Sequence, residues 1–407
     1  KRGNLGGSNL RLFTHGSGGS VQIQAYLLSA NTLAVGNGTE VTTTQVFRDP
    51  HAWYHLVIRV DTSQGTDADR VRLYLNGSQI TSFSASSYPS QNGDVFTSTG
   101  WRIAAYSGGT GNNFDGYMSE VIYCDGQSLG PTSFGETDNN GVWRPINVSG
   151  LTFGNNGFYL NFAASGSDLG DDASGNSNDF TNTNSVTQTT DSPTNNAAIL
   201  SPLWTDTTLS NGNLKAVATG NAYQWAISSI AIPSSGKWTC EFQSSNINGS
   251  SLYGYIGIAQ MGNHNNKTGT SNRWGINLGN GEVYNGSGTE VHDFSTSSYA
   301  TTLMRLEYDA DADTIKIFSA GSEIFPASTG ASATVGLTGQ SSLHFFCAPY
   351  GSGADFTATF KGLSGTPTSG YLELNTTNLL TNSTPAIKDP DDHFKEVIVD
   401  HDGSSTN

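Results

Sequence analysis

The fold is decided by the stretch Trp53-Tyr-His-Leu-Val-Ile-Arg-Val-Asp61, followed after a polar loop by Val71-Arg-Leu-Tyr-Leu-Asn-Gly77. In both runs apolar residues occupy every second position, which is the periodicity of a β-strand with one buried face. Asn76-Gly77 supplies the left-handed backbone that a tight hairpin requires. Such strands need a second sheet to cover their apolar faces, so the stretch predicts an antiparallel β-sandwich.

The composition extends this expectation to the whole chain. It has 407 residues, with 49 Gly against 12 Pro and only 13% charged residues, and no long stretch has helical periodicity. Many short strands joined by turns give such a composition. A chain of this length exceeds what one core usually serves. We therefore expect an all-β protein with two tandem antiparallel β-sandwiches.

The charge and the cysteines exclude several classes of protein. A net charge of −16 argues against nucleic acid as a partner, because the phosphate backbone rewards Lys and Arg. No apolar run is long enough for a membrane-spanning helix, so no membrane insertion is expected. Cys124, Cys240 and Cys347 lack the Cys-x-x-Cys spacing of a zinc site. Buried free thiols are the favoured interpretation, and a pair between Cys240 and Cys347 stays open.

A later strand completes a recognisable order of motifs. Phe114-Asp-Gly-Tyr-Met-Ser-Glu-Val-Ile-Tyr123 follows the strand at Trp53 and the hairpin at Gly77. This order resembles the laminin-G-like, concanavalin A-type jelly roll. The resemblance implies such a domain over residues 1–165, with the opening Lys1-Arg2-Gly3 lying just after the first strands of the module. We therefore expect a domain without its first strands, and a sheet edge that something else must cover.

A second module follows a polar segment. Residues 166–201 are rich in Asn, Asp, Ser and Thr and are expected to form a linker. Ser234-Ser-Gly-Lys-Trp-Thr-Cys-Glu-Phe242 and then Tyr255-Ile-Gly-Ile-Ala259 are similar to the SPRY domain, which implies a second sandwich over residues 202–374 that binds proteins. Residues 375–407 are expected to hold a connector and the start of a further module. Within them, Phe394–Val399 is predicted to pair with another chain or to be poorly anchored.

Residues 135–180 carry a third distinctive block, with Gly135–Pro145, Asn156–Phe162 and Asp172–Phe180 as its parts. Together with the flanking modules, this block resembles a family of bacteriophage virion proteins. The resemblance implies a structural or adhesion component on the virion, as a tail fibre or surface appendage. Its expected partners are other virion subunits, including further copies of the chain, and a cell-surface glycan.

Aromatic residues at predicted loop ends are the candidate binding residues. Amphipathic rings can stack on sugar faces, and they occupy core and turn positions just as readily. Both interpretations stay open for four residues: Trp143, Tyr253, Trp274 and Tyr350.

The best candidate metal site lies between residues 171 and 179. Oxygen-bearing side chains occur there at every second position, as in a calcium loop. However, Gly175 is misplaced for an EF-hand and no Glu closes the loop. Asx turns produce the same composition, so calcium stays only an alternative and no cofactor is assigned. The candidate ligands are Asp171, Asp172, Asn176, Asn178 and Asp179.

Catalysis has one candidate, the run Glu307-Tyr-Asp309-Ala-Asp311. It comes close to the three-acid strand of concanavalin-type glucanases, and glycoside hydrolysis needs paired carboxylates. The third acid, Asp311, is an aspartate where the glucanase pattern has a glutamate, so its carboxyl group lies one methylene short of the required position. Glu307 is expected on a solvated face beside Arg305. The aspartates are expected in a hairpin turn. We therefore expect no catalytic residues and no enzyme activity. The alternatives are a secreted glycoside hydrolase and a fibre subunit that polymerises by strand addition.

Overall fold

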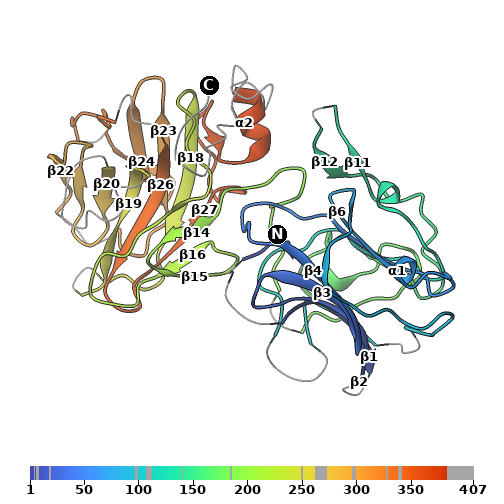
Figure 1. The fold of residues 1–407 in the computed structure, drawn as a ribbon. Helices are drawn as coiled ribbons and strands as arrows, with labels where there is room; N and C mark the ends of the chain where they lie inside the picture. The colour runs from blue at the N-terminus through green and yellow to red at the C-terminus, as the bar shows by residue number, and fades with distance from the viewer. Residues whose placement is uncertain are drawn as a thin grey trace, which may run out of the picture.

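Figure 1 shows two bodies built of strands, one from each half of the chain. This computed structural model describes residues 1–382, apart from residue 4 and ranges 6–8, 18–19, 97–99, 107–111, residue 140, and ranges 184–185, 249–250, 262–272, 296–298, 327–328 and 338–341. The prediction of an all-β protein with antiparallel sandwiches is confirmed. The predicted strand Phe394–Val399 lies outside the described residues.

The first body has one continuous sheet of six antiparallel strands. Its hairpins follow the chain from β1 to β4, and β8 and β9 close the two edges. In sheet order the strands are β8 (Phe83–Ser86), β4 (Thr39–Val46), β3 (Thr32–Asn37), β2 (Ser20–Leu27), β1 (Leu10–Ser17) and β9 (Trp101–Ile103).

The opposing layer of the first body consists of separate small sheets. The deciding stretch forms β5 and β6, and Asn76 (φ 47°) and Gly77 (φ 81°) turn the chain into β7 as predicted. Short helical segments are α1 (Asp67–Arg70), between β5 and β6, and 3-10 turns at Pro131–Ser133 and Gly166–Gly170. The small sheets are β5 (Leu56–Val60) with β6 (Val71–Leu75) and β7 (Ser78–Ile80), β10 (Val121–Tyr123) with β13 (Phe158–Leu160), and β11 (Gly135–Thr137) with β12 (Trp143–Pro145).

The second body is a sandwich of two large sheets. The seven-stranded sheet runs β14 (Leu200–Thr205), β17 (Ala226–Ser228), β26 (Leu343–Tyr350), β19 (Tyr253–Gln260), β20 (Arg273–Asn277), β21 (Glu282–Tyr284) and β22 (Glu290–Asp293). The eight-stranded sheet runs β15 (Thr208–Ser210), β16 (Lys215–Val217), β27 (Asp355–Thr359), β18 (Lys237–Gln243), β23 (Met304–Asp309), β24 (Thr314–Ser319) and β25 (Ser322–Phe325), and β28 (Leu372–Glu373) pairs with β18.

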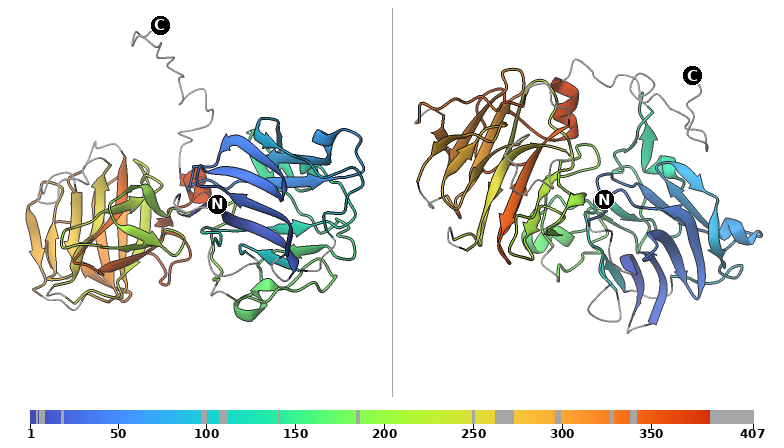
Figure 2. Two further views of the ribbon diagram at one scale, coloured as in Figure 1. Left: turned by 60° about the horizontal axis from the view of Figure 1, so that its bottom comes forward. Right: turned by 60° about the vertical axis from the view of Figure 1, so that its left-hand side comes forward.

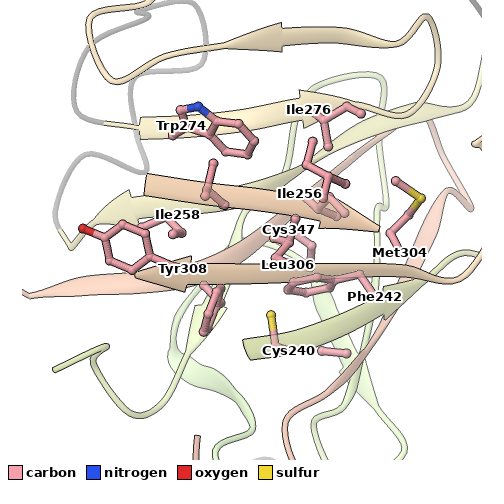
Figure 3. Packing of buried hydrophobic residues seen from close by; sticks show 14 of the residues in the cluster. Cys240, Phe242, Ile256, Ile258, Trp274, Ile276, Met304, Leu306, Tyr308 and Cys347 are labelled. Carbon is pink, nitrogen blue, oxygen red and sulfur yellow. The ribbon is translucent and has the colours of Figure 1, made fainter. Parts of the chain in front are cut away.

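The core of the second sandwich lies between these sheets (Figure 3). Strand periodicity sends alternate residues inward, so Ile256 and Ile258 of β19 face Leu306 of β23 across the interior. Cys240 and Cys347 come from opposite sheets and are fully buried free thiols, as favoured from the sequence. Burial raises the pKa of both thiols, so neither is a reactive thiolate.

The two sandwiches meet at the N-terminal residues, as the two views of Figure 2 show. Lys1 Nζ lies 2.8 Å from a carboxylate oxygen of Asp191, and the Asn213 amide donates to the Gly3 carbonyl at 3.0 Å. The Tyr117 hydroxyl donates to the carbonyl of Gly212 at 2.7 Å. The helix α2 (Thr376–Asn382) follows the last strand. Among the described residues, no helix is long and apolar enough to cross a membrane.

Candidate binding site

Tyrosine side chains gather on the outer face of the seven-stranded sheet. Ile256 and Ile258 of β19 point into the core, so Tyr253 and Tyr255 on the same strand point outward. The register pairs Tyr253 with Tyr350 of β26. We call the following set the tyrosine face: Tyr223, Tyr253, Tyr284 and Tyr350, half-buried at the surface, with Tyr255, Trp225, Arg273 and Phe346 beneath them.

Three of these rings form a row across the end of the sheet. Tyr253 and Tyr350 stack with ring centroids 4.4 Å apart and an interplanar angle of 17°. Tyr223 is bridged to Tyr350 through the backbone, and its ring lies 5.0 Å from Tyr350 and 5.7 Å from Tyr253. All three residues are half-buried, so ring edges and hydroxyl groups stay at the surface. The row is therefore an aromatic surface with polar tips.

A buried layer supports the row. The rings of Trp225 and Phe346, both almost fully buried, lie 4.6 Å apart. The Arg273 guanidinium lies 5.0 Å from the Trp225 ring and 4.8 Å from the Tyr255 ring, in cation–π geometry. Burial lowers the pKa of Arg273, but a guanidinium keeps its charge at neutral pH. The tyrosine face therefore carries one positive charge beneath its rings.

Two buried donors in this layer have no acceptor among the described residues, namely Trp225 Nε1 and Arg273 Nη1. An unpaired buried donor costs about 1–3 kcal/mol. Burial also raises the pKa of the tyrosines at 223, 253 and 255, so their hydroxyl groups stay protonated at neutral pH and can donate hydrogen bonds.

The structure separates the four aromatic residues proposed from the sequence. Tyr253 and Tyr350 lie together in the row described above. Trp274 is fully buried in the core cluster, so it occupies the core position that the sequence left open. Trp143 belongs to β12 of the first sandwich, where its ring packs on the turn at Gly77.

Four further residues of this face were not predicted from the sequence: Tyr223, Tyr255, Tyr284 and Arg273. Tyr255 had one available signal, because it follows Tyr253 at the strand period of two. The others join the face only through strand pairing, which the sequence pattern does not specify: Tyr223 is bridged to Tyr350, and Arg273 and Tyr284 enter through the pairs with Ala259 and Gly275.

The calcium candidates form a network of hydrogen bonds within the loop. The Asp172 carboxylate accepts bonds from the backbone amides of Tyr159, Ser174 and Asn178 and from the Ser174 hydroxyl, at 2.7–2.9 Å. Burial opposes ionisation of Asp172, but these bonds outweigh it and lower its pKa. The bonds also hold part of the predicted linker against β13. They occupy the oxygens that a cation would use, as in the Asx-turn interpretation.

The other candidate ligands lie around Asp172. Asp179 accepts from the backbone amide of Asp172 at 2.9 Å. The side-chain amides of Asn176 and Asn178 both donate to the Gly157 carbonyl, at 2.9 and 2.8 Å. Asp171 is exposed. Among the described residues, no three His, Cys, Asp or Glu side chains gather as a metal cluster would require.

The expectation that Glu307 lies on a solvated face is wrong. Its side chain is fully buried, and one oxygen accepts from Arg305 Nε at 3.1 Å and from the Thr368 backbone amide at 2.8 Å. The segment 361–374, which we call the strap, covers this outer face and pairs with β18 through β28. Ser364 and Gly365 of the strap donate to Glu241. The sequence did not reveal this cover because the strap lies more than fifty residues along the chain from Glu307.

The remaining acids of this run do not join Glu307 in a groove. Asp309 accepts from the backbone amides of Asp311 and Ala312 at 3.1 Å, in the turn between β23 and β24. This agrees with the predicted hairpin turn. Asp313 accepts from the Tyr308 hydroxyl at 3.0 Å.

Comparisons with known proteins give a family match for the first body and similar solved structures. Residues 1–126 match the family model Laminin_G_3, described as the concanavalin A-like lectin/glucanases superfamily. The SPRY domain of human HERC1 is a similar solved structure, with 17% identity over 40% of this chain and 99% of that chain and a TM-score of 0.33. Another human SPRY domain shows 8% identity over 42% and 98% of the two chains and a TM-score of 0.30. A search of curated proteins found no match.

The family match supports a lectin-like module in the first body, of the kind used for binding or adhesion. The matched residues are less than a third of the chain, so they describe this module and not the whole protein. The matches named above do not include a bacteriophage protein.

Proposed function

We propose that this chain is a non-enzymatic binding protein and that the tyrosine face is its contact surface. The observation that carries this proposal is the stacked pair Tyr253 and Tyr350, extended by Tyr223 into a row. Rings of this kind present apolar faces and hydroxyl donors together, at little cost in conformational entropy. A sugar has the complementary surface, with apolar C–H faces and hydroxyl oxygens. A cell-surface glycan is therefore the proposed ligand.

The proposed setting is the outside of a virus particle. The support for it is the order of motifs in the sequence, with the block at residues 135–180 between a laminin-G-like module and a SPRY-like module. In this setting the chain is a structural or adhesion subunit of a tail fibre or surface appendage of a bacteriophage. Its other partners are neighbouring virion subunits and further copies of the chain.

The burial of Glu307 supports a binding role over hydrolysis. Hydrolysis of a glycoside requires two carboxyl groups that reach the same sugar bond. Glu307 is enclosed by the strap, and the nearby Glu241 accepts bonds from Ser364 and Gly365. A substrate could reach these carboxylates only if the strap moved away.

A glycan array incubated with the purified chain tests the proposal. The expected result is retention of the chain on a defined group of glycans, with no release of reducing sugar from them. An array without binders would contradict the binding role. Cleavage of a glycan by the chain, abolished in the variant Glu307→Gln, would contradict the non-enzymatic role and support the hydrolase.

A further inference from the structure

The first sandwich contains a large cavity between its two layers. The volume of this cavity is about 1210 Å³, whereas protein interiors are close-packed and pockets for small ligands usually measure about 300–1,000 Å³. The cavity lies where the opposing layer is divided between the sheet of β5 and the sheet of β10. A ligand of this site would therefore fill a gap in a sheet as well as a space in a core.

The free edge of β5 presents backbone groups to the cavity. The Asn76 amide donates to the His55 carbonyl, so the backbone at position 55 bonds toward β6. Residues of an antiparallel strand bond alternately to one side and the other. Among the described residues, β5 pairs with β6 alone. The residues whose amides and carbonyls point to the free edge are therefore Leu56, Ile58 and Val60.

The free edge of β10 follows from the same rule. The Tyr159 amide donates to Asp172 and its carbonyl accepts from Ala173, so the backbone of Tyr159 bonds away from β10. Ile122 is the register partner of Tyr159, and its amide and carbonyl therefore point away from β13. Ile122 and β5 both line the cavity. Two strand edges without a partner in the described part of the chain thus border one space.

The strands β5 and β10 run in the same direction along the cavity. The ring of Trp53, shortly before β5, lies 6.3 Å from the ring of Tyr117, shortly before β10. Near the other ends, the Asn92 amide donates to the carbonyl at position 62, and the ring of Phe96, four residues later, lies 5.4 Å from that of Tyr123 in β10. A strand inserted between β5 and β10 can therefore be antiparallel to both, which is the more stable pairing.

Apolar side chains border the gap on both faces. Leu56 and Ile58 pack with the core cluster of the first sandwich, so alternate positions of β5 face the other way. On that outer side the ring of His55 lies 5.7 Å from the ring of Trp143, in the segment 128–145. An inserted strand would therefore have the six-stranded sheet on one side and this segment on the other. Apolar lining residues include Phe13, Ile23 and Leu27 on the first side and Leu129, Phe134 and Pro145 on the second.

One end of the gap is acidic. Asp61 follows β5, Asp125 follows β10, and Asp94 lies on the segment that connects these two ends, and all three residues line the cavity. Arg59 lies 3.6 Å from Asp61 and offsets one of the three charges. A strand antiparallel to β5 and β10 has its N-terminal end here. Basic residues that precede such a strand would therefore be favoured.

We propose that this cavity is a binding site for an extended peptide segment of a partner protein, which adds a strand between β5 and β10. A polypeptide carries donors and acceptors that alternate to both sides at the strand spacing, and a lipid or a sugar does not. The segment is apolar on both faces over the five residues that match β5, and basic residues precede it. A second copy of the chain is a poor donor, because every described strand already pairs within a sheet.

Hydrogen exchange of the full chain with a peptide panel tests this site. Each peptide is Lys-Lys followed by five residues drawn from Val, Ile, Leu, Phe and Thr. The tightest peptide is expected to slow exchange at the free edges at least about tenfold, whereas the amides of Val57 and Arg59, which bond to β6, should be unaffected. The amides expected to be slowed are those of Leu56, Ile58, Val60 and Ile122.

Two controls separate the backbone and charge contributions. The same peptide N-methylated at its middle residue keeps its side chains and loses one backbone donor, and it should bind at least about tenfold more weakly. The variant Asp94→Asn, at an exposed position, should weaken binding of the Lys-Lys peptide and leave binding of a Thr-Thr counterpart unchanged.

Several results would overturn the proposal. Slow exchange of the four edge amides in the chain alone would mean that another part of the chain covers them. Protection that rises with chain concentration without peptide would assign the site to a second copy. Failure of the whole panel to slow these amides, or equal binding of the N-methylated peptide, would show that the edges do not accept a strand. Protection by dodecanoate and not by the peptides would assign the cavity to a lipid.

Discussion

Glu307 is a buried carboxylate whose role follows from its partners. It accepts from Arg305 and from the Thr368 amide of the strap, and its side chain is fully enclosed. Removing one partner of a buried ion pair leaves the other charge uncompensated. Glu307 therefore joins β23 to the strap and is a determinant of stability.

The first prediction concerns this residue. Glu307→Ala should lower the free energy of unfolding by about 3–5 kcal/mol, because Arg305 and the Thr368 amide lose their acceptor. Urea denaturation followed by tryptophan fluorescence measures the change. The control Glu323→Ala breaks the partly exposed ion pair with Lys316, at 3.3 Å, and should cost less than about 1 kcal/mol. Equal losses in the two variants would contradict the buried role of Glu307.

The second prediction concerns Asp172, whose hydrogen bonds lower its pKa. A lowered pKa in the folded chain gives stability that is present above the unfolded pKa of about 4 and is lost as the pH falls through the folded value. Asp172→Asn should therefore destabilise the chain at pH 7, by about 2 kcal/mol for lost charge-assisted bonds. The difference should shrink near pH 2. Thermal denaturation of both chains across this range measures it, and a difference independent of pH would contradict the account.

The third prediction uses the same loop to test calcium. The Asp172 oxygens already accept four bonds, so millimolar calcium should leave the melting temperature unchanged. Magnesium at the same concentration controls for ionic strength. A rise with calcium that Asp172→Asn abolishes would revive the metal site proposed from the sequence.

At the scale of elements, the hairpin between β6 and β7 depends on a close approach. Gly77 has φ 81°, and a Cβ atom there would overlap the Trp143 ring of β12. Gly38, in the hairpin between β3 and β4, has φ 79° with open space around it. The two glycines therefore share backbone strain and differ in packing.

The fourth prediction follows from that difference. Gly77→Ala should destabilise the first sandwich by about 1–3 kcal/mol more than Gly38→Ala, because only the former also overpacks against a ring. Chemical denaturation of the two variants gives the comparison. Equal effects would show that Trp143 does not rest on this turn.

The sequence predicted elements better than the contacts between them. Alternation from Trp53 to Gly77 predicted β5, β6 and the hairpin turn, because those signals lie within a few residues of one another. The burial of Glu307 was mispredicted because its cover comes from a distant segment. The pairing of Tyr253 with Tyr350 likewise depends on register between strands far apart in the chain. Periodicity reports which face is apolar and does not report what packs on the other face.

At the scale of the whole molecule, a buried ion pair joins the first sandwich to the segment that leads into the second. The side chains of Lys1 and Asp191 are 0% and 6% exposed, and Lys1 Nζ also donates to Asn196 at 2.7 Å. Burial lowers the pKa of Lys1, while Asp191 opposes that change. The junction therefore depends on a desolvated charge whose partner must remain in place.

The fifth prediction tests this junction. Asp191→Ala should loosen the contact between the sandwiches, because the buried Lys1 ammonium loses its partner. Small-angle scattering should show a larger maximum dimension than for the wild type. The control Asp67→Ala removes an exposed carboxylate 2.8 Å from Arg70, within the first sandwich, and should leave the scattering unchanged. If the maximum dimension of Asp191→Ala equals that of the wild type, the prediction is contradicted, and the other contacts at the junction hold it rigid.

The binding role of the tyrosine face is the central claim, and one comparison on a glycan array tests it most directly. The double variant Tyr253→Ala/Tyr350→Ala should lose at least about tenfold in affinity for the glycans that retain the wild type, because aromatic residues dominate the energetics of binding surfaces. The control Tyr74→Ala changes a half-buried tyrosine of the first sandwich and should bind like the wild type. Undiminished binding by the double variant would contradict the account.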